Sequence, residues 1–449
     1  MASVHRLRSL LRSGPLVLLL GCSGMAVAVA APRFDLPGAL AGAIADNPKE
    51  VIDQVWQIVY RDYLDSSGAY SDSRWRQLRR DVLTRSYAGT GESYEAIRSM
   101  LASLDDPYTR FLDPKEFKEM QIDTSGELRG VGIQLSLDKE TKELVVVAPI
   151  EGTPAARAGV QPKDVIVSID GQTTRGMTTE DAVKLIRGPE GSEVVLGLRR
   201  QGALVDVALK RARIEINAVT SSLNTSADGS TKVGYIRLKQ FNANASKEMR
   251  AAIQSHESNG AQGYVLDLRS NPGGLLEASI DIARQWLDEG TIVSTRTREG
   301  IRDVRRATGN AITDKPMVVL IDQGSASASE ILSGALQQNQ RAQLIGQKTF
   351  GKGLVQAVRG LADGSGMTVT VAKYLTPDGT DIHKNGIEPD VAAAFTEQEM
   401  RQIRSQDLGT QRDKQYRVAE KTLMQVLRGT KLSHHYQPHS SNLAAALSS

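Results

Sequence analysis

Apolar residues recur at every third or fourth position in the first periodic part of the chain. Asn47, Pro48 and Glu50 supply an N-cap, a proline at the first helical position and an acidic first turn. The spacing predicts that residues 47–120 are mostly helical, and we assign a helical N-terminal region to residues 31–118. No residue of this region indicates chemistry. The periodic positions are Val51, Val55, Ile58, Val59, Trp75, Leu78, Val82, Ile97, Met100, Leu101 and Leu104.

Short runs typical of strands replace this periodicity between residues 126 and 213. Some of these runs alternate apolar and polar residues and others are rich in β-branched residues, and the turn Asp170-Gly171 ends one of them. A helix is predicted from Thr179 to Ile186. We therefore expect a β-rich domain over residues 119–213. The predicted strands are 130–135, Leu144–Val147, Asp164–Ile169 and Glu193–Leu198.

Strands and helices alternate in the third region, residues 214–400. Its strands are continuous apolar runs, which predicts a parallel sheet that helices cover on both faces. Functional groups of such sheets collect in the turns at the carboxyl ends of the strands. Gly273-Gly274 and Ser325–Ser329 occupy two such turns. The predicted strands are Val233–Leu238, Tyr264–Leu268, Met317–Ile321 and Ala342–Ile345, and the predicted helices are Leu275–Trp286 and Ala328–Gln337.

The two ends of the chain carry separate signals. A basic start, an apolar stretch and the small-x-small site Ala28-Val29-Ala30 predict a secretion signal over residues 1–30. The apolar stretch is shorter than the ~20 residues that span a bilayer, so an uncleaved anchor is the minor alternative. Cys22 follows Leu19-Leu20-Gly21, which resembles the lipobox of bacterial lipoproteins. Residues 401–449 are expected to form a C-terminal helix and a disordered tail.

Composition narrows the class of protein. The 55 Lys and Arg residues nearly balance 52 Asp and Glu residues, and 40% of the chain is hydrophobic. This excludes a polytopic membrane protein and gives no electrostatic case for binding nucleic acid. Cys22 is the only cysteine. Cleavage after Ala30 would leave no cysteine, which excludes disulfides, cysteine-based zinc sites and thiol nucleophiles.

The serine-rich turn Gly324–Glu330 is the first candidate for chemistry. A serine between a strand and a helix can expose its hydroxyl at the helix N-terminus, where the dipole stabilises an oxyanion. The alternative is structural, because Ser327 and Glu330 stand at capping-box spacing.

A nucleophilic serine needs a base, and the sequence offers two kinds. His383 is the only histidine placed for a Ser-His-Asp triad, since His256 lies on a polar helical segment and is expected to be exposed. Lys352, between two glycines, is the competing base, because burial lowers the pKa of a lysine. Lys348 competes with it, and a solvated loop cation is the structural alternative.

Residues 126–213 resemble a PDZ domain. In a glycine-rich loop, successive backbone N–H groups can bind a peptide's terminal carboxylate while the peptide adds to the sheet as a strand. The loop residues Gly130, Val131, Gly132 and Ile133 are therefore candidates for peptide binding, although the glycines alone could form a simple turn. Arg187 is either a helix-end cation or a substrate contact. The resemblance rests on Gly130–Ile133, Gly152–Ala155, Ala158–Val160, Asp164–Ile166 and Asp170-Gly171.

Residues 50–400 resemble the carboxyl-terminal processing (tail-specific) peptidases, which are secreted serine peptidases with a PDZ domain inserted before a Ser-Lys core. The resemblance implies a multidomain α+β protein whose protease core, residues 214–400, is an α/β fold of the crotonase or ClpP type. It also implies that the enzyme needs no metal or cofactor. The matching motifs are Asp267–Arg269, Asn271–Leu275, Gly324–Ile331, Gly346–Gly353, Thr376–Gly379 and Gly386–Asp390.

By position in these motifs, the resemblance implies that Ser327 is the nucleophile, Lys352 the general base and Gln356 the group that orients the lysine. The N–H of Ala328, with that of Gly273 or Gly274, would form the oxyanion hole.

The expected partners are exported proteins with apolar C-terminal tails. The enzyme would either process a specific precursor, such as one of the photosystem II reaction centre, or degrade exported proteins. Its expected location is the periplasm or the thylakoid lumen, with membrane association only through an uncleaved signal or a lipidated Cys22. The alternative from a different class is a catalytically silent PDZ scaffold.

Overall fold

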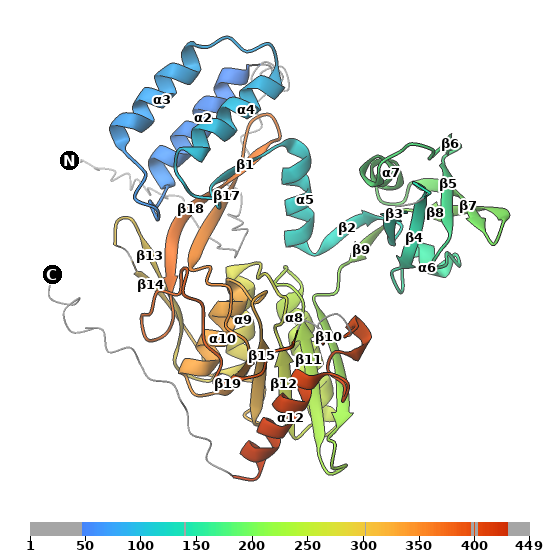
Figure 1. The fold of residues 1–449 in the computed structure, drawn as a ribbon, viewed down its shortest axis with the longest axis vertical. Coiled ribbons are helices and arrows are strands. Elements are labelled where there is room, and N and C mark those ends of the chain that lie inside the picture. The colour runs from blue at the N-terminus through green and yellow to red at the C-terminus, as the bar shows by residue number, and fades with distance from the viewer. Residues whose placement is uncertain (1–46, 139–140, 301, 397–398, 400–402, 430–449) are drawn as a thin grey trace, which may run out of the picture. The chain divides into compact units, whose positions relative to one another are not determined.

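The computed structural model describes residues 47–138, 141–300, 302–396, 399 and 403–429 (Figure 1). The predicted signal over residues 1–30, Cys22 and the predicted tail beyond residue 429 lie outside them. The chain forms two compact units. One contains the chain up to Lys118, Val219–Phe241 and the part from Ala245 onward, and the other contains Glu119–Ala218 with Asn242–Asn244.

The N-terminal region is helical, as predicted. Asn47 accepts a hydrogen bond from the Lys49 N–H and begins the first helix. The apolar faces pack around Trp56 and Trp75, whose indole N–H groups each donate to the other's backbone carbonyl, at 2.8 and 3.2 Å. The elements are α2 (Pro48–Asp62), α3 (Asp72–Thr84), α4 (Thr90–Ala102), β1 (Arg110–Leu112) and α5 (Pro114–Ser125).

The N-terminal helices pack against a five-stranded antiparallel sheet. Strand β18 pairs with β17 along one edge and with β1 and β13 along the other. Ala357, Met367 and Val369 of the β17–β18 ribbon belong to the same apolar core as the N-terminal helices. The helical region is thereby attached to a ribbon that starts just after Lys352. The strands are β1, β13 (Thr291–Thr297), β14 (Arg302–Arg306), β17 (Leu354–Gly360) and β18 (Gly366–Leu375).

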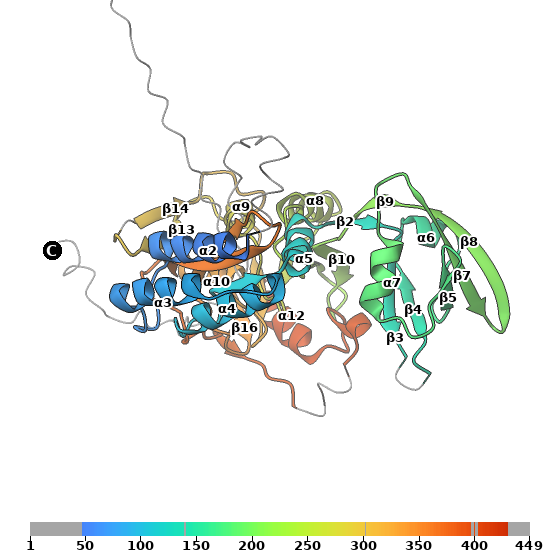
Figure 2. The ribbon, with the colours of Figure 1, turned by 90° about the horizontal axis from the view of Figure 1, so that it is seen from above.

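The second large sheet of this unit is the predicted parallel sheet. Its order is β10-β11-β12-β15-β16-β19, in which all neighbours are parallel except the edge pair β10 and β11. Helices α8 (Ala245–Ser258), α9 (Leu276–Trp286) and α10 (Ala328–Gln338) cover one face and α12 (Lys414–Leu427) covers the other (Figures 1 and 2). The strands are β10 (Val219–Thr225), β11 (Lys232–Leu238), β12 (Gly263–Asp267), β15 (Met317–Ile321), β16 (Ala342–Gly346) and β19 (Val391–Ala392).

The exposure predicted for His256 is wrong. His256 follows Ile253 by three residues on α8, so it shares the buried face of that helix, and it is only 5% exposed. Its ring lies edge-on to Tyr264, and its Nε2 has no hydrogen-bond partner among the described residues. Burial lowers the pKa of His256. It is a buried core histidine.

The second unit holds a six-stranded antiparallel sheet in the order β3-β4-β5-β7-β8, in which β6 also pairs with β5, and a two-stranded β2-β9 ribbon. The predicted strand over 130–135 is interrupted, because Val131-Gly132 forms a loop between β2 and β3. Helix α7 runs over Thr179–Ile186 as predicted, with a capping box of Thr178 and Asp181. The elements are β2 (Glu127–Gly130), β3 (Ile133–Leu137), β4 (Leu144–Pro149), α6 (Pro154–Arg157), β5 (Val165–Ile169), β6 (Gln172–Thr173), α7, β7 (Glu193–Arg200), β8 (Ala203–Lys210) and β9 (Ala212–Glu215).

Candidate active site

Ser327 stands in a strained turn at the carboxyl end of β15. It is the N-cap residue of α10, with φ 61° and ψ −106°, and it is fully buried. A non-glycine residue with positive φ costs of order 1–3 kcal/mol and persists only where its surroundings enforce it. The turn therefore holds this serine in one enforced position, at the positive end of the α10 dipole.

The three serines of the turn differ in what their hydroxyls contact. Ser325 Oγ donates to the Leu268 carbonyl at 2.8 Å, and Ser329 Oγ donates to the Asn271 carbonyl at 2.9 Å. Ser327 Oγ has no hydrogen-bond partner among the described residues. Ser327 is thus the serine of this turn whose hydroxyl is not engaged in holding the structure.

A buried carboxylate connects the serine turn to the lysine loop. Glu330 Oε2 accepts hydrogen bonds from the N–H groups of Ser327 at 2.6 Å and Lys352 at 2.9 Å. Its Oε1 accepts from the Gly351 N–H at 2.7 Å and from Thr349 Oγ1 at 2.6 Å. Burial raises the pKa of Glu330, while these donors oppose that shift. Glu330 therefore fixes the backbone of both loops at once.

Tyr374 on β18 makes a second connection between the same residues. Its hydroxyl contacts the carbonyl of Ser327 at 3.1 Å and also that of Lys352. Burial raises the pKa of Tyr374 well above its ordinary value, so the hydroxyl remains a donor. Both the N–H and the carbonyl of Lys352 are consequently held in place by buried side chains.

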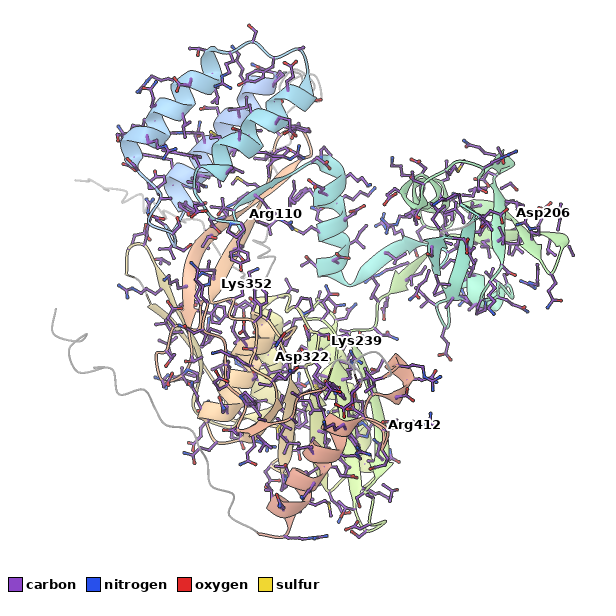
Figure 3. The ribbon with its side chains drawn as sticks, in the orientation of Figure 1. Arg110, Asp206, Lys239, Asp322, Lys352 and Arg412 are labelled. Atoms are coloured by element: carbon purple, nitrogen blue, oxygen red, sulfur yellow. The ribbon has the colours of Figure 1, made fainter. Side chains whose placement is uncertain are left out.

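Lys352 is buried just before β17, whereas Lys348 faces solvent. Lys352, labelled in Figure 3, is 8% exposed. Its Nζ lies 4.5 Å from the centroid of the Tyr108 ring. The Lys348 side chain is 52% exposed and pairs with Glu388 at 2.7 Å. Gln356, on β17, is buried, and its Oε1 has no hydrogen-bond partner among the described residues. The structure thus brings Ser327 and Lys352 onto loops that Glu330 joins.

His383 does not form a Ser-His-Asp triad among the described residues. Its Nδ1 has no hydrogen-bond partner, and Asp381 accepts instead from the backbone N–H of His383, at 2.8 Å. Burial lowers the pKa of His383. Its ring lies edge-on to Tyr108 in a cavity of about 270 Å³ that also borders Pro107, Phe350 and Gly351.

The loop after β12 lies against the serine turn. The carbonyl of Asn271 accepts from the Ala326 N–H at 3.0 Å. Gly274, with φ 144°, lies so close to Phe241 that a Cβ at this position would be 2.2 Å from the Phe241 carbonyl oxygen. The Gly273 N–H donates to Asn271 Oδ1 at 2.9 Å, so this predicted oxyanion donor already has a partner. Ala328 begins α10, where N–H groups lack intrahelical acceptors.

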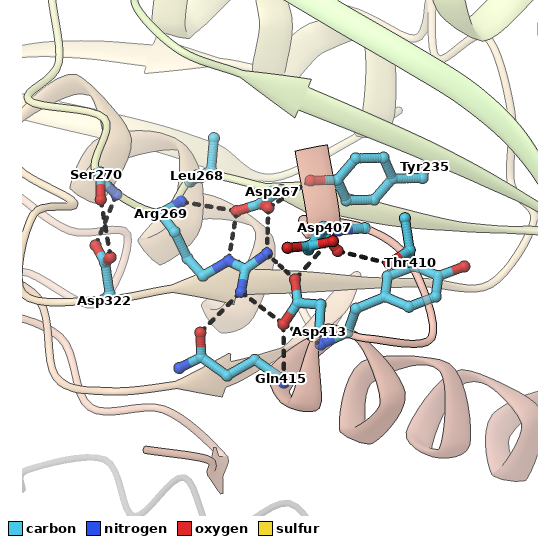
Figure 4. Close-up of polar contacts among 12 residues, drawn as sticks. Tyr235, Asp267, Leu268, Arg269, Ser270, Asp322, Asp407, Thr410, Asp413 and Gln415 are labelled. Carbon is cyan, nitrogen blue, oxygen red and sulfur yellow. Dashed lines mark hydrogen bonds and ion pairs between the residues drawn. The ribbon is translucent and has the colours of Figure 1, made fainter. Parts of the chain in front are cut away.

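A buried ionic cluster, which the sequence pattern did not indicate as a unit, anchors the same loop (Figure 4). Arg269 contacts the carboxylates of Asp267 and Asp413 through Nη2, at 2.6 Å each. Asp413 is the N-cap of α12, and Gln415 Oε1 accepts from Arg269 Nη1 at 2.8 Å. Burial opposes ionisation of Asp267, but Arg269 holds the pKa of its carboxyl below the usual value. The only local signal was Asp267-Leu268-Arg269, because Asp413 is 144 residues away in sequence.

The candidate peptide loop of the second unit has a defined orientation. The carbonyls of Val131 and Gly132 accept from the N–H groups of Ala155 and Ile150, at 2.9 and 2.8 Å. In a trans peptide the next N–H points the opposite way, so the N–H groups of Gly132 and Ile133 point away from that segment. Strand β3 is an open edge of the sheet. The Arg187 Cγ lies 3.8 Å from the point where a Cβ on Gly130 would sit.

Within the described ranges, two other kinds of feature are absent. No cluster of His, Cys, Asp and Glu residues there could hold a metal ion. Nor does any helix in the same residues have the length and apolar character needed to cross a bilayer.

Comparison with known proteins agrees with this geometry. Residues 232–393 match the model of peptidase family S41, and residues 145–200 match a PDZ domain model. A "Carboxyl-terminal-processing protease" of Synechocystis sp. is 48% identical over 79% of this chain and 82% of its own length. A chloroplastic "Carboxyl-terminal-processing peptidase 2" of Arabidopsis thaliana is 43% identical over 75% of this chain and 67% of its own length.

The solved structures include a relative of similar extent. The structure titled "Photosystem II D1 C-terminal processing protease" is 39% identical to this chain, covers 78% of it and 93% of its own length, and superposes with a TM-score of 0.51. The predicted multidomain fold, with a PDZ domain and an α/β core, is confirmed.

Proposed function

Because this chain belongs to peptidase family S41 and is a serine peptidase that acts on proteins, we propose that Ser327 is its nucleophile and Lys352 its general base. One observation carries the proposal. Of the serines in the turn, Ser327 has the hydroxyl without a structural partner, and its backbone is joined through Glu330 to that of a buried lysine. Gln356 is the residue that orients the lysine through its Oε1.

The chemistry is acyl transfer. The neutral amine of Lys352 takes the proton of Ser327 Oγ as the oxygen attacks the scissile carbonyl, and the resulting ammonium then protonates the leaving amine. Water hydrolyses the acyl-enzyme in a second, equivalent cycle. The oxyanion accepts from the Ala328 N–H and from the N–H of Gly273 or Gly274. The Gly273 N–H must first leave Asn271 Oδ1. Loss of one such donor typically lowers the rate ~10²–10³-fold.

We place substrate selection in the second unit. The N–H groups of Gly132 and Ile133 would bind the terminal carboxylate of an apolar tail, with Arg187 beside it, while the tail adds to the open edge of β3. Gly130 and Val131 shape the loop. The substrates are then proteins with apolar C-terminal tails.

The location and the physiological substrate follow from the relatives as proposals. They include cyanobacterial and chloroplastic enzymes, and one is titled a photosystem II D1 processing protease. We therefore propose an exported enzyme of the thylakoid lumen, or of the periplasm if it degrades exported proteins. Mass spectrometry of a deletion strain separates the two roles: accumulation of one uncleaved precursor supports processing, and accumulation of many exported proteins supports degradation.

The catalytic assignment is tested with an unfolded protein that carries an apolar C-terminal tail. Ser327→Ala and Lys352→Ala should abolish cleavage, measured by mass spectrometry of the products. Lys348→Ala, which removes a solvent-exposed lysine from the same loop, should retain it. Undiminished cleavage by either of the first two variants would contradict the assignment, and tail binding without any cleavage by the wild type would favour the silent scaffold.

A further inference from the structure

The turn between α4 and β1 reaches the catalytic lysine. Tyr108 belongs to the helical N-terminal region, in which the sequence indicated no chemistry. Its half-buried ring lies under Lys352 Nζ, 4.5 Å from the ring centroid. This distance is within the ~6 Å over which an aromatic face attracts a cation.

Three hydrogen bonds hold this turn against β18, and a fourth, from the Tyr108 N–H to Asp106, closes the turn itself. Asp106 accepts from the Tyr108 N–H at 2.9 Å and from Thr370 Oγ1 at 2.7 Å. Thr368 Oγ1 donates to the Tyr108 carbonyl at 2.7 Å, and Thr109 Oγ1 accepts from the Thr370 N–H at 3.0 Å. The ring is therefore fixed relative to the sheet that also carries Gln356 on the neighbouring strand.

We propose that Tyr108 is a further catalytic residue, whose ring face stabilises the Lys352 ammonium as it forms. This inference rests on the proposed function. In the first step the O–H bond of Ser327 breaks, the proton forms a new N–H bond at Lys352 Nζ, and the oxygen electron pair forms the bond to the substrate carbonyl carbon. The ring quadrupole attracts the ammonium far more than the neutral amine. The contact therefore strengthens towards the transition state, which is the condition for catalysis.

Other titratable or charged groups lie around the contact between Lys352 and Tyr108. Glu330 and Asp106 are carboxylates close enough to act electrostatically on Tyr108. His383 lies edge-on to Tyr108 at 6.3 Å between ring centroids, and Lys384 borders the same cavity. All of these remain when only the Tyr108 side chain is changed. A leucine at this position keeps apolar volume and loses the π face.

The experiment compares the pH profiles of kcat/KM for Tyr108→Phe and Tyr108→Leu, with the full chain and the tailed unfolded substrate. Tyr108→Phe keeps the ring and should match the wild type. Tyr108→Leu should lower the alkaline plateau by about 2- to 30-fold, the range for a cation over an aromatic face. It should also shift the acidic limb to lower pH by up to about one unit, because the ammonium of the base is no longer stabilised.

Tyr94→Leu is the matched control. Tyr94 packs on the same helical core, against Phe111 and Asp363, so its loss perturbs the region without removing the ring under Lys352. The acidic limb of this variant should stay in place. Tyr108→Leu with a lowered plateau and an unmoved limb would show a merely structural role and overturn the proposal.

Three further outcomes are distinguishable. A gain of activity in Tyr108→Leu would show that the ring holds the lysine in a resting position, and it would also overturn the proposal. Cleavage that persists in Lys352→Ala would refute the proposed function itself. If the wild type cleaves, Lys352→Ala is inactive and Tyr108→Leu has the wild-type profile, only the inference about Tyr108 fails.

Discussion

At the residue scale, Glu330 is the side chain on which the geometry of the site depends most. Each of its oxygens accepts two hydrogen bonds, from groups of the serine turn and of the 349–352 loop. Glu330→Gln keeps the shape but turns one acceptor oxygen into an NH2 donor that faces two donors. The free energy of unfolding should fall by about 3 kcal/mol, and cleavage should fall with it. Urea unfolding followed by tryptophan fluorescence measures the first effect.

Glu388→Gln is the control for Glu330→Gln. Glu388 pairs with Lys348 through side chains that are both more than half exposed, and such pairs are worth about 0–1 kcal/mol. Its urea midpoint and its activity should stay near the wild-type values. A Glu330→Gln variant with the same midpoint and rate as Glu388→Gln would contradict the role given to this carboxylate.

Sequence pattern alone left the roles of single residues open, and the reason is physical. The spacing of Ser327 and Glu330 fits a helix cap as well as a catalytic turn, and only the positions of neighbouring carbonyls show which hydroxyl is engaged. Lys348 and Lys352 likewise cannot be told apart as candidate bases from the sequence, but the structure shows that Lys352 is buried and Lys348 is exposed. The exposure of His256 was predicted wrongly because its neighbours along α8 are polar, although His256 lies on the same buried helix face as Ile253.

At the element scale, periodicity predicted most helices and strands, since burial on one face or on both sets the pattern. It predicted α2, α7 and the parallel strands, including β15 at Met317–Ile321. It did not predict the break at Val131-Gly132, because the alternation continues through a loop whose carbonyls are held by another segment. Nor could it show that α12 and the loop after β12 share a buried ionic cluster.

That cluster predicts that the C-terminal helix supports the loop of Gly273 and Gly274, whose N–H groups we propose as oxyanion donors. Asp413→Asn removes a buried carboxylate from Arg269, which directly precedes the loop of Gly273 and Gly274. The free energy of unfolding should fall by about 3 kcal/mol, the lower end for a broken buried pair, because Asp267 still neutralises Arg269. Urea denaturation measures the loss, and the rate of cleavage should also decrease.

Asp281→Asn gives the comparison for Asp413→Asn. Asp281 pairs with Arg284 on the surface of α9, and its side chain is 52% exposed. This variant should unfold within about 0.5 kcal/mol of the wild type. If Asp413→Asn unfolds at the same urea concentration as Asp281→Asn, the cluster does not stabilise the fold.

At the scale of the whole molecule, contacts between distant parts of the chain decide function. The helical N-terminal region was predicted correctly, but its contact with Lys352 through Tyr108 was not. That contact depends on the pairing of β1 with β18, whose residues are more than 250 positions apart in the sequence. Such pairing leaves no periodic trace in the sequence. The PDZ resemblance, in contrast, rests on local motifs, which is why the sequence indicated it.

The last prediction concerns tail recognition by the complete protein. If the loop of Gly132 and Ile133 binds the terminal carboxylate with Arg187 beside it, amidating the substrate tail should raise KM roughly tenfold, the factor for 1.4 kcal/mol. Arg187→Gln should raise KM similarly for the free tail and have little further effect on the amidated tail, because both changes remove the same interaction. Arg175→Gln, an exposed arginine of the same unit, should change neither. Equal effects of Arg187→Gln on both tails would exclude recognition of the carboxylate by Arg187.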